Sequence, residues 1–469
     1  MYFNKNEKQH LLVIGGNVSG LAAASQARRN APDIDITVLE SGEHISYGTC
    51  GLPYYISGIV DDINKLFVYP PSFFEEKRNI RILTGHKVTA LNPNKKELSV
   101  KIKDGSETGI FNYDKLIICS GAKPVDLKTD GLENSCNVFH FRNVSDALAL
   151  KNYINKNNPL RAVVIGGGSI GLLIAEALIK IGIKPVVMEK SETIFGDFEK
   201  EISGVLSERA VNQGCSLFVN SFVSSVIKND NNNITELIIG SNVEPCSENI
   251  SADIVVLAAG IEANTSFIKG NSIELGHRKA IKTSPRLQTN YSNIFAAGDC
   301  CCVKNIVTGK YAYIPTANNA ARMGRIAGEN ATGGDEIFNG SAGTKVDVVF
   351  DLEVAKTGIS FDEALSLGFN PVRIRDTYPS HAVAIPGAAD IKIVLIADYP
   401  SGKILGAQMI GHDGVAKRID IFSASITCGM TVSDVYNLDL SYSPSTSTVW
   451  DPVNKICGKA LLNFKKRRF

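Results

Sequence analysis

The chain has 469 residues, of which 44% are hydrophobic and 21% are charged, and its formal net charge is +1. This length exceeds what one hydrophobic core normally organises, so we expect two or three domains in an ordinary globular protein. The balanced charge gives no field that would recruit nucleic acid or an anionic membrane, and no apolar run reaches the roughly 18 residues of a membrane span. We therefore expect small-molecule partners, with no nucleic acid and no membrane.

The first ten residues are polar and lead directly into an apolar strand, so they do not resemble a secretory signal. We expect a cytoplasmic protein. In that compartment the ten cysteines are expected to be thiols, and any disulfide is expected to be transient.

Residues 11–41 have the pattern of a strand, a glycine turn, a helix rich in small residues and a second strand. This pattern is typical of a βαβ unit that binds a dinucleotide, because the glycines allow the turn and bring backbone N–H groups to a pyrophosphate. An acidic residue closes the second strand, where it can accept hydrogen bonds from ribose hydroxyls. The predicted binding residues of this unit are Gly15, Gly16, Asn17, Gly20 and Glu40.

The next segment, SYGTCGLPYY, holds Cys50 with no second cysteine nearby. Cys50 precedes a helix that we expect to begin between Gly51 and Pro53, so the positive end of the helix dipole is expected to favour the thiolate. The thiolate is the form that attacks a disulfide. Cys50 is therefore the candidate nucleophile, and a buried inert thiol is the alternative.

Residues 162–191 repeat the pattern of residues 11–41. Gly166, Gly168 and Gly171 complete the motif G-x-G-x-x-G, and Glu189 closes the following strand. Two such units, each with its acidic residue, indicate two different dinucleotides, which suggests a flavin and a nicotinamide.

Three more apolar strands end in small residues, at 115–124, 254–267 and 293–300. The last of them delivers Asp299, whose carboxylate is placed to hold a ribityl hydroxyl. From about residue 341 onward, further strands and a helix predict a separate α+β unit. The strand ends add the candidates Ser120, Gly121, Gly260 and Asp299.

On these motifs, the chain from about residue 10 to its C-terminal tail resembles the pyridine nucleotide-disulfide oxidoreductases. The resemblance implies an α/β fold with two Rossmann-like dinucleotide-binding domains, of the glutathione reductase type, and a C-terminal α+β dimerisation domain. It implies FAD in the first unit, NAD(P)H in the second and a homodimer. The implied domains are residues 1–148 with 268–340 for FAD, 149–267 for NAD(P)H and 341–469 for the interface.

Most members of this family carry a pair of redox cysteines, whereas Cys50 and its surroundings resemble the single-cysteine branch. The implied activity is reduction of a low-molecular-weight disulfide or persulfide, of the coenzyme A disulfide type, at Cys50. Residues 439–454 resemble the segment whose tyrosine reaches the partner's cysteine, so Tyr442 is the implied proton donor. The implied substrate-binding residues are Gln26, Arg29, Ser46 and Arg322.

Two other functions stay open. An NADH oxidase or peroxidase would use a Cys50 sulfenate, but relatives with that activity carry a histidine where this chain has Val18. A flavin-bound binding or sensing protein would explain why Ser169 and Leu173 replace the tyrosine and glutamate that position the nicotinamide in relatives. Glu189 is expected to repel a 2′-phosphate and favour NADH, whereas the adjacent Lys190 could tolerate NADPH.

The other cysteines give no pattern of this kind. Cys300, Cys301 and Cys302 form a run after Asp299, but no second cluster with zinc-like spacing accompanies them, so we expect a structural role and no metal. Cys246 is isolated and is given the same role.

Overall fold

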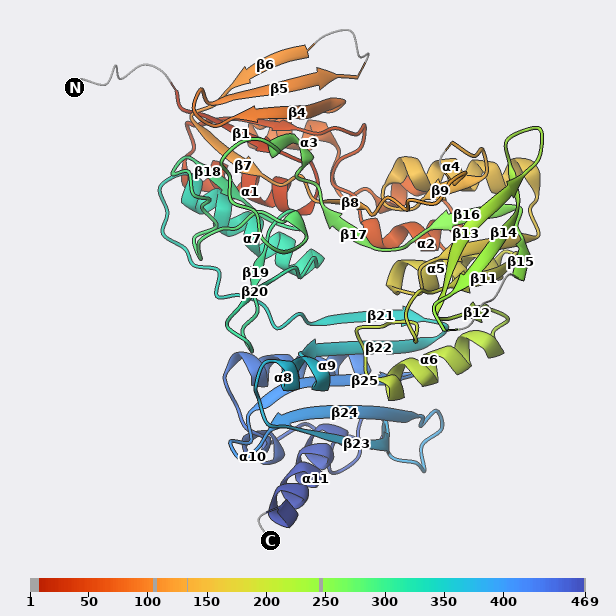
Figure 1. Ribbon diagram of the computed structural model, residues 1–469. Coiled ribbons are helices and arrows are strands. Elements are labelled where there is room, and N and C mark those ends of the chain that lie inside the picture. Colours follow the sequence, from red (N-terminus) through yellow and green to blue (C-terminus); the bar gives the residue numbers. More distant parts are fainter. Residues whose placement is uncertain (1–7, 104–107, 133, 244–247, 468–469) are drawn as a thin grey trace.

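The computed structural model describes residues 8–103, 108–132, 134–243 and 248–467. Three five-stranded sheets organise the molecule. In Figure 1 the first unit, in red, orange and teal, lies at the upper left, the second unit, from yellow to green, lies at the right, and the blue C-terminal unit lies below. Cys246 lies outside the described residues.

The first unit is a parallel sheet in the order β18-β7-β1-β2-β3. Its strands are apolar and buried, as expected where helices cover both faces of a parallel sheet. The strands are β1 (His10–Ile14), β2 (Asp35–Leu39), β3 (Arg81–Leu83), β7 (Lys115–Ile118) and β18 (Ile294–Ala296), with the antiparallel β4 (His86–Asn92), β5 (Glu97–Ile102) and β6 (Thr108–Asn112) beside them.

Two helices of the first unit pack in close contact, α1 (Val18–Asn30) and α7 (Ala317–Ala331). Glycines on α7 permit this approach: a Cβ on Gly324 would lie 2.3 Å from the carbonyl oxygen of Ser19, and one on Gly328 would lie 2.2 Å from that of Ala23. The first unit also contains α3 (Pro71–Arg78), β19 (Val303–Lys304) and β20 (Tyr311–Ala312). The short helix α2 (Leu52–Ile56) instead places its buried Leu52 and Ile56 in the core of the second unit.

The second unit repeats the architecture with a parallel sheet in the order β12-β11-β10-β16-β9. Its strands are β9 (Val138–His140), β10 (Arg161–Ile165), β11 (Lys184–Met188), β12 (Ser216–Phe218) and β16 (Ile254–Leu257), and its helices are α4 (Val144–Asn157), α5 (Ser169–Lys180) and α6 (Lys200–Asn212). A three-stranded antiparallel sheet of β13 (Ser221–Lys228), β14 (Ile234–Ser241) and β15 (Glu248–Ser251) lies beside it, and β8 (Ala122–Pro124) pairs with β17 (Ile261–Ala263) between the first two units. Because β9 joins this sheet, the second unit begins before residue 149, the boundary expected from sequence.

The third unit is the predicted α+β domain. Its antiparallel sheet has the order β21-β22-β25-β24-β23, so β21 forms one edge. The strands are β21 (Lys345–Val349), β22 (Leu352–Gly358), β23 (Pro371–Pro379), β24 (Asp390–Asp398) and β25 (Ile404–Gly411), and the helices are α8 (Phe361–Ser366), α9 (Val415–Thr427), α10 (Val432–Tyr436) and α11 (Pro452–Arg467). Figure 1 shows β21 and β22 next to the second unit. Across the described ranges, no helix has both the length and the apolar composition that crossing a bilayer requires.

Candidate active site

The two glycine turns have the same hydrogen bonds. In the first unit the N–H of Gly16 donates to Oε2 of Glu40 at 2.7 Å, and in the second the N–H of Gly167 donates to Oε2 of Glu189 at 2.7 Å. A further backbone N–H, two residues beyond each glutamate, donates to the other carboxylate oxygen. Each glutamate is thereby fixed beside its turn, and its carboxylate keeps lone pairs for further donors such as ribose hydroxyls.

The third glycine of each motif is required by the close packing of helix against strand. A Cβ on Gly20 or on Gly171 would lie 1.9 Å from the carbonyl oxygen of the first glycine of its own motif, so helix and strand could not approach as they do. The middle position differs, because a Cβ on Gly168 would meet no atom within 4 Å. This open position explains how the first unit accommodates Asn17 there.

A cavity of about 370 Å³ lies beside the first glycine turn. Residues predicted for the first dinucleotide site line it together, which places separate sequence segments around one space. They are Gly15, Asn17, Glu40, Ser120 and Gly121. Tyr47 and Thr49 also line this cavity, so it reaches the turn that carries Cys50.

Asp299 has a partner that the sequence did not reveal. Nη2 of Arg142 lies 2.9 Å from Oδ2 of Asp299, and Arg142 also lines the cavity. Arg142 directly precedes Asn143, which caps α4 of the second unit, so this ion pair links the first two units at the cavity. The two side chains are 24% and 19% exposed, so solvent screens their attraction only in part.

The start of α7 contains buried polar atoms that lack a partner in the described part of the chain. They are the hydroxyl oxygens of Tyr313 and Thr316 and Oδ1 of Asn319. Thr316 stands at the N-cap of this helix without using its side chain as a cap. Buried polar atoms normally have hydrogen-bond partners, and the charge of Asp299 acts on Tyr313, so these atoms fit a bound polar group such as the flavin that the family resemblance implies. The sequence signal for these residues is the threonine that precedes a helix with spaced glycines.

Cys50 lies in a single 3₁₀ turn (Thr49–Gly51) immediately before α2, as predicted. Its side chain is exposed to solvent, although neighbouring protein partly desolvates the sulfur. The sequence predicted that the helix dipole would stabilise the Cys50 thiolate. In the structure the pKa of this thiol is instead raised above its ordinary value. Partial burial is the largest influence and raises the pKa of Cys50, the carboxylates of Asp347 and Asp299 raise this pKa further, and the guanidinium of Arg142 lowers it. The helix that follows has only five residues, so its dipole contributes little.

Tyr442 lies in the loop between α10 and α11 of the third unit and is 49% exposed. No hydrogen bond or ring contact in the described ranges joins it to the turn of Cys50. Two large apolar side chains of the same loop are exposed as well, Trp450 at 50% and Val449 at 71%. The role of Tyr442 at a partner's cysteine stays a prediction.

Comparison with protein families identifies the fold. Residues 9–324 match the model described as pyridine nucleotide-disulphide oxidoreductase, and residues 346–452 match its dimerisation domain. The chain belongs to the pyridine nucleotide-disulphide oxidoreductase family. It is a flavin-dependent NAD(P)H oxidoreductase, and the predicted fold class, with two Rossmann-like domains and a dimerisation domain, is confirmed.

Two named relatives align with nearly the whole length of this oxidoreductase. The chain is 32% identical over 452 residues to the CoA-dependent NAD(P)H sulfur oxidoreductase of Pyrococcus furiosus, covering 95% of this chain and 98% of that protein. It is 27% identical to the coenzyme A disulfide reductase of Staphylococcus haemolyticus, covering 96% and 99%.

Two solved structures are similar over 98% of this chain. The reduced CoADR-RHD of Bacillus anthracis has a TM-score of 0.93 at 33% identity, with 81% of that chain covered. The NAD-dependent persulfide reductase of A. fulgidus has a TM-score of 0.92 at 31% identity, with 84% covered.

The predicted substrate residues of the oxidoreductase do not form one cluster. Nε2 of Gln26 donates to Glu329 at 2.7 Å, and Arg29 donates to Oε1 of Gln26 through Nε at 3.0 Å and Nη2 at 2.6 Å. Arg322 lies over the ring of Phe338, at 5.1 Å from its centroid. Ser46 is separate and buried: its backbone N–H donates to the carbonyl oxygen of Gly16. Their contact with a substrate stays a prediction.

The cysteine run of the oxidoreductase is buried. Cys300, Cys301 and Cys302 are at most 2% exposed, and the sulfurs of the first two lie 3.7 Å apart. Cys457 is fully buried in the core of the third unit. All cysteines in the described part of the chain are free thiols, so none of them is bonded to Cys50.

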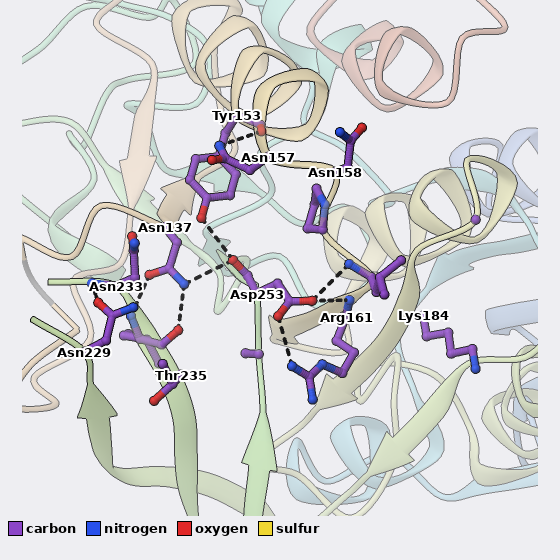
Figure 2. Close-up of a pocket in the computed structure, with 15 residues that line it drawn as sticks. Asn137, Tyr153, Asn157, Asn158, Arg161, Lys184, Asn229, Asn233, Thr235 and Asp253 are labelled. Atoms are coloured by element: carbon purple, nitrogen blue, oxygen red, sulfur yellow. Dashed lines mark hydrogen bonds and ion pairs between the residues drawn. The ribbon is translucent and has the colours of Figure 1, made fainter. Parts of the chain in front are cut away.

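A larger cavity, of about 750 Å³, lies at the other edge of the second sheet (Figure 2). Its lining includes Arg161 and Lys184, the first residues of β10 and β11, whereas the glycine turn follows the last residue of β10. Figure 2 shows Asp253 at its centre, where the carboxylate accepts hydrogen bonds from the backbone N–H groups of Leu160 and Arg161 and from the Arg161 guanidinium. The Asp253 carboxylate is thus already hydrogen-bonded within the protein, to Leu160 and Arg161. Ligands of open α/β sheets bind at the opposite edge of the sheet.

Proposed function

We propose that this oxidoreductase uses NAD(P)H to reduce a low-molecular-weight disulfide or persulfide through Cys50, with coenzyme A as the thiol. The observation that carries the proposal is the place of Cys50: it is an exposed, unpaired thiol in a turn whose first residue, Thr49, lines the cavity of the first dinucleotide unit. The names of the relatives from Pyrococcus furiosus and Staphylococcus haemolyticus support a sulfur substrate and coenzyme A.

The Cys50 thiolate attacks one sulfur of the substrate disulfide, which forms a mixed disulfide and releases one thiolate. The bound flavin supplies the two electrons that NAD(P)H brings. These electrons restore the Cys50 thiolate and release the second thiol, so one disulfide, one NAD(P)H and one proton give two thiols and NAD(P)+.

Protonation of the leaving thiolate requires a donor near Cys50. We assign this role to Tyr442 of the partner subunit in a homodimer, which the match to a dimerisation domain supports. The exposure of Tyr442 and its apolar neighbours fits a surface that a second copy covers. Gln26 and Arg29 are the proposed contacts of the coenzyme A phosphates, because a guanidinium binds phosphate oxygens well.

The decisive experiment compares Cys50→Ser with Cys428→Ser, since Cys428 is also an exposed thiol. Turnover of coenzyme A disulfide, cystine and polysulfide with NADH should disappear in Cys50→Ser and remain in Cys428→Ser. Mass spectrometry of the non-reduced protein should show a thiol adduct on Cys50 whose mass names the substrate. Full disulfide reduction by Cys50→Ser would overturn the proposal.

A second candidate is an NADH oxidase, because a relative of that name from Methanocaldococcus jannaschii is 27% identical over 452 residues. Val18, the first residue of α1, offers no proton for oxygen chemistry at this turn. Rapid oxygen consumption without turnover of any disulfide would favour the oxidase.

A further inference from the structure

Asp347 lies where the second and third units meet. It belongs to β21, the edge strand of the third unit, and its Oδ2 accepts a hydrogen bond from Oγ of Ser169 at 2.6 Å. Ser169 is the first residue of α5 and directly follows Gly168 of the glycine turn. The carboxylate therefore reaches the N-terminal turn of the helix that begins the NAD(P)H unit.

The second oxygen of this carboxylate is available. A carboxylate can accept about four hydrogen bonds, and the described residues supply Asp347 with the one from Ser169. Lys345, two residues earlier on the same face of β21, is bonded to Asp197 at 2.7 Å. Burial raises the pKa of Asp347, Ser169 and Lys345 lower it, and the negative charge of Asp197 raises it.

The surroundings indicate which donor would fit. The carboxylate of Asp347 adjoins the first residue of α5, directly after the glycine turn of the second unit, and its negative charge also acts on Cys50. A nicotinamide whose dinucleotide is bound at this glycine turn must place its ring beside the flavin, which receives the hydride, so groups at the start of α5 are candidates for holding the ring. Its carboxamide carries a neutral NH2 group, which donates hydrogen bonds without adding charge to a half-buried site.

The first turn of α5 offers no alternative acceptor of this kind. Leu173, at the position where a carboxylate was expected from the resemblance, is apolar and packs against the core of the second unit. We propose that Asp347, held by Ser169, accepts a hydrogen bond from the carboxamide NH2 of the nicotinamide and so positions the ring. This inference rests on the proposed function only for its use of NAD(P)H.

The Ser169–Asp347 hydrogen bond could instead serve only to join the two units, as the Asp197–Lys345 ion pair does. Substitution of Lys345 by Met therefore provides a matched control, because it breaks a neighbouring contact between the same units and leaves the carboxylate in place.

The test measures ligand binding to the flavin-loaded protein by titration calorimetry. Three ligands are compared: NAD+, its 3-acetylpyridine analogue, which lacks the NH2 group, and ADP-ribose, which lacks the ring. Loss of a hydrogen bond to a charged acceptor should make Asp347→Ala bind NAD+ at least about 10-fold more weakly. The affinities of Asp347→Ala for the other two ligands should stay within about 2-fold of wild type, and Lys345→Met should bind all three as wild type does.

The isosteric Asp347→Asn keeps the shape of the side chain and serves where Asp347→Ala folds poorly; its preference for NAD+ over the analogue should be reduced. Equal weakening of all three ligands by Asp347→Ala, no change in any, or the same change in Lys345→Met would overturn the inference. These binding results do not depend on the thiol substrate, so they stand even where Cys50→Ser shows the proposed reductase activity to be wrong. Wild-type protein that binds neither NAD+ nor ADP-ribose would overturn the inference together with the use of NAD(P)H.

Discussion

Arg418 of α9 and Asp451 form a buried ion pair, and Asp451 is the last residue of the loop that carries Tyr442. Nε of Arg418 lies 2.9 Å from Oδ2 of Asp451, and the two side chains are 8% and 9% exposed. Nη2 of Arg418 also donates to the carbonyl oxygens of Ser380, at 2.9 Å, and Thr446, at 3.3 Å. One guanidinium therefore fixes both the loop of Tyr442 and the segment beside it.

Asp451→Ala should destabilise the third unit strongly, because it leaves the Arg418 guanidinium buried without its counter-ion. Removing one partner of a buried pair costs about 3–5 kcal/mol. Chemical denaturation should show this loss in the free energy of unfolding. Asp420→Ala, which removes an exposed ion pair with Lys417 on the same helix as Arg418, should change the free energy of unfolding by less than about 1 kcal/mol. Equal stabilities of the two variants would contradict the role assigned to Arg418.

Substitutions in the two glycine turns should weaken the binding of the two cofactors separately. Gly20→Ala should weaken FAD binding and Gly171→Ala should weaken NADH binding, since each new Cβ would lie 1.9 Å from a carbonyl oxygen and force the helix away from its strand. The strain is expected to be about 1–3 kcal/mol. Gly168→Ala is the control for folding, because nothing lies within 4 Å of its new Cβ. Flavin absorbance per chain and NADH titration separate the two effects, and a Gly171→Ala protein that loses only its flavin would refute this assignment.

The parts of the site that the sequence predicted are those encoded by local spacing. The glycine turns with Glu40 and Glu189 each lie within one βαβ unit, so the sequence specifies their geometry almost completely. Arg142 and Asp347 could not be predicted in this way. Their partners are 157 and 178 residues distant in the sequence, and only the packing of separate units brings them together.

The protonation of Cys50 shows the same limit. The helix that follows the cysteine is a local feature of the sequence, and it predicts a favoured thiolate. The structure adds Asp347 and Asp299, which come from distant parts of the chain and raise the pKa of Cys50 together with partial burial. The local pattern indicates Cys50 as the candidate nucleophile, and contacts with distant residues contribute to raising its pKa.

Glu189 should make the oxidoreductase prefer NADH. Its carboxylate is fixed by the N–H of Gly167 at 2.7 Å and keeps its negative charge where the 2′-phosphate of NADPH would lie. The ratio of kcat/KM for NADH to that for NADPH should exceed about 10 in wild type, since like charges repel by about 1–2 kcal/mol at such distances. Glu189→Gln, which keeps the hydrogen-bond acceptor, should reduce this ratio. An unchanged ratio in Glu189→Gln would show that another group selects the cofactor.

The exposed apolar residues near Tyr442 should form part of the homodimer interface. Val449 is 71% exposed and Trp450 is 50% exposed, and a large exposed apolar surface usually marks an interaction site. Val449→Asp should shift the protein from dimer to monomer in light scattering and lose disulfide turnover, while its bound flavin remains. Val243, which is 70% exposed on the second unit, gives the matched control Val243→Asp, which should stay dimeric. A dimeric and fully active Val449→Asp would exclude this surface.

The reactivity of Cys50 should depend on pH in a defined direction. Partial burial, Asp347 and Asp299 raise the pKa of the thiol, so in the flavin-free protein the rate of alkylation by iodoacetamide should rise with pH around a midpoint above that of an ordinary cysteine. Arg142→Met removes the charge that lowers this pKa and should move the midpoint to still higher pH. Asp299→Asn removes a charge that raises the pKa and should move the midpoint to lower pH. Opposite shifts in these two variants, read out by mass spectrometry at Cys50, identify electrostatic control, and shifts in the same direction would show that both act through a change in structure.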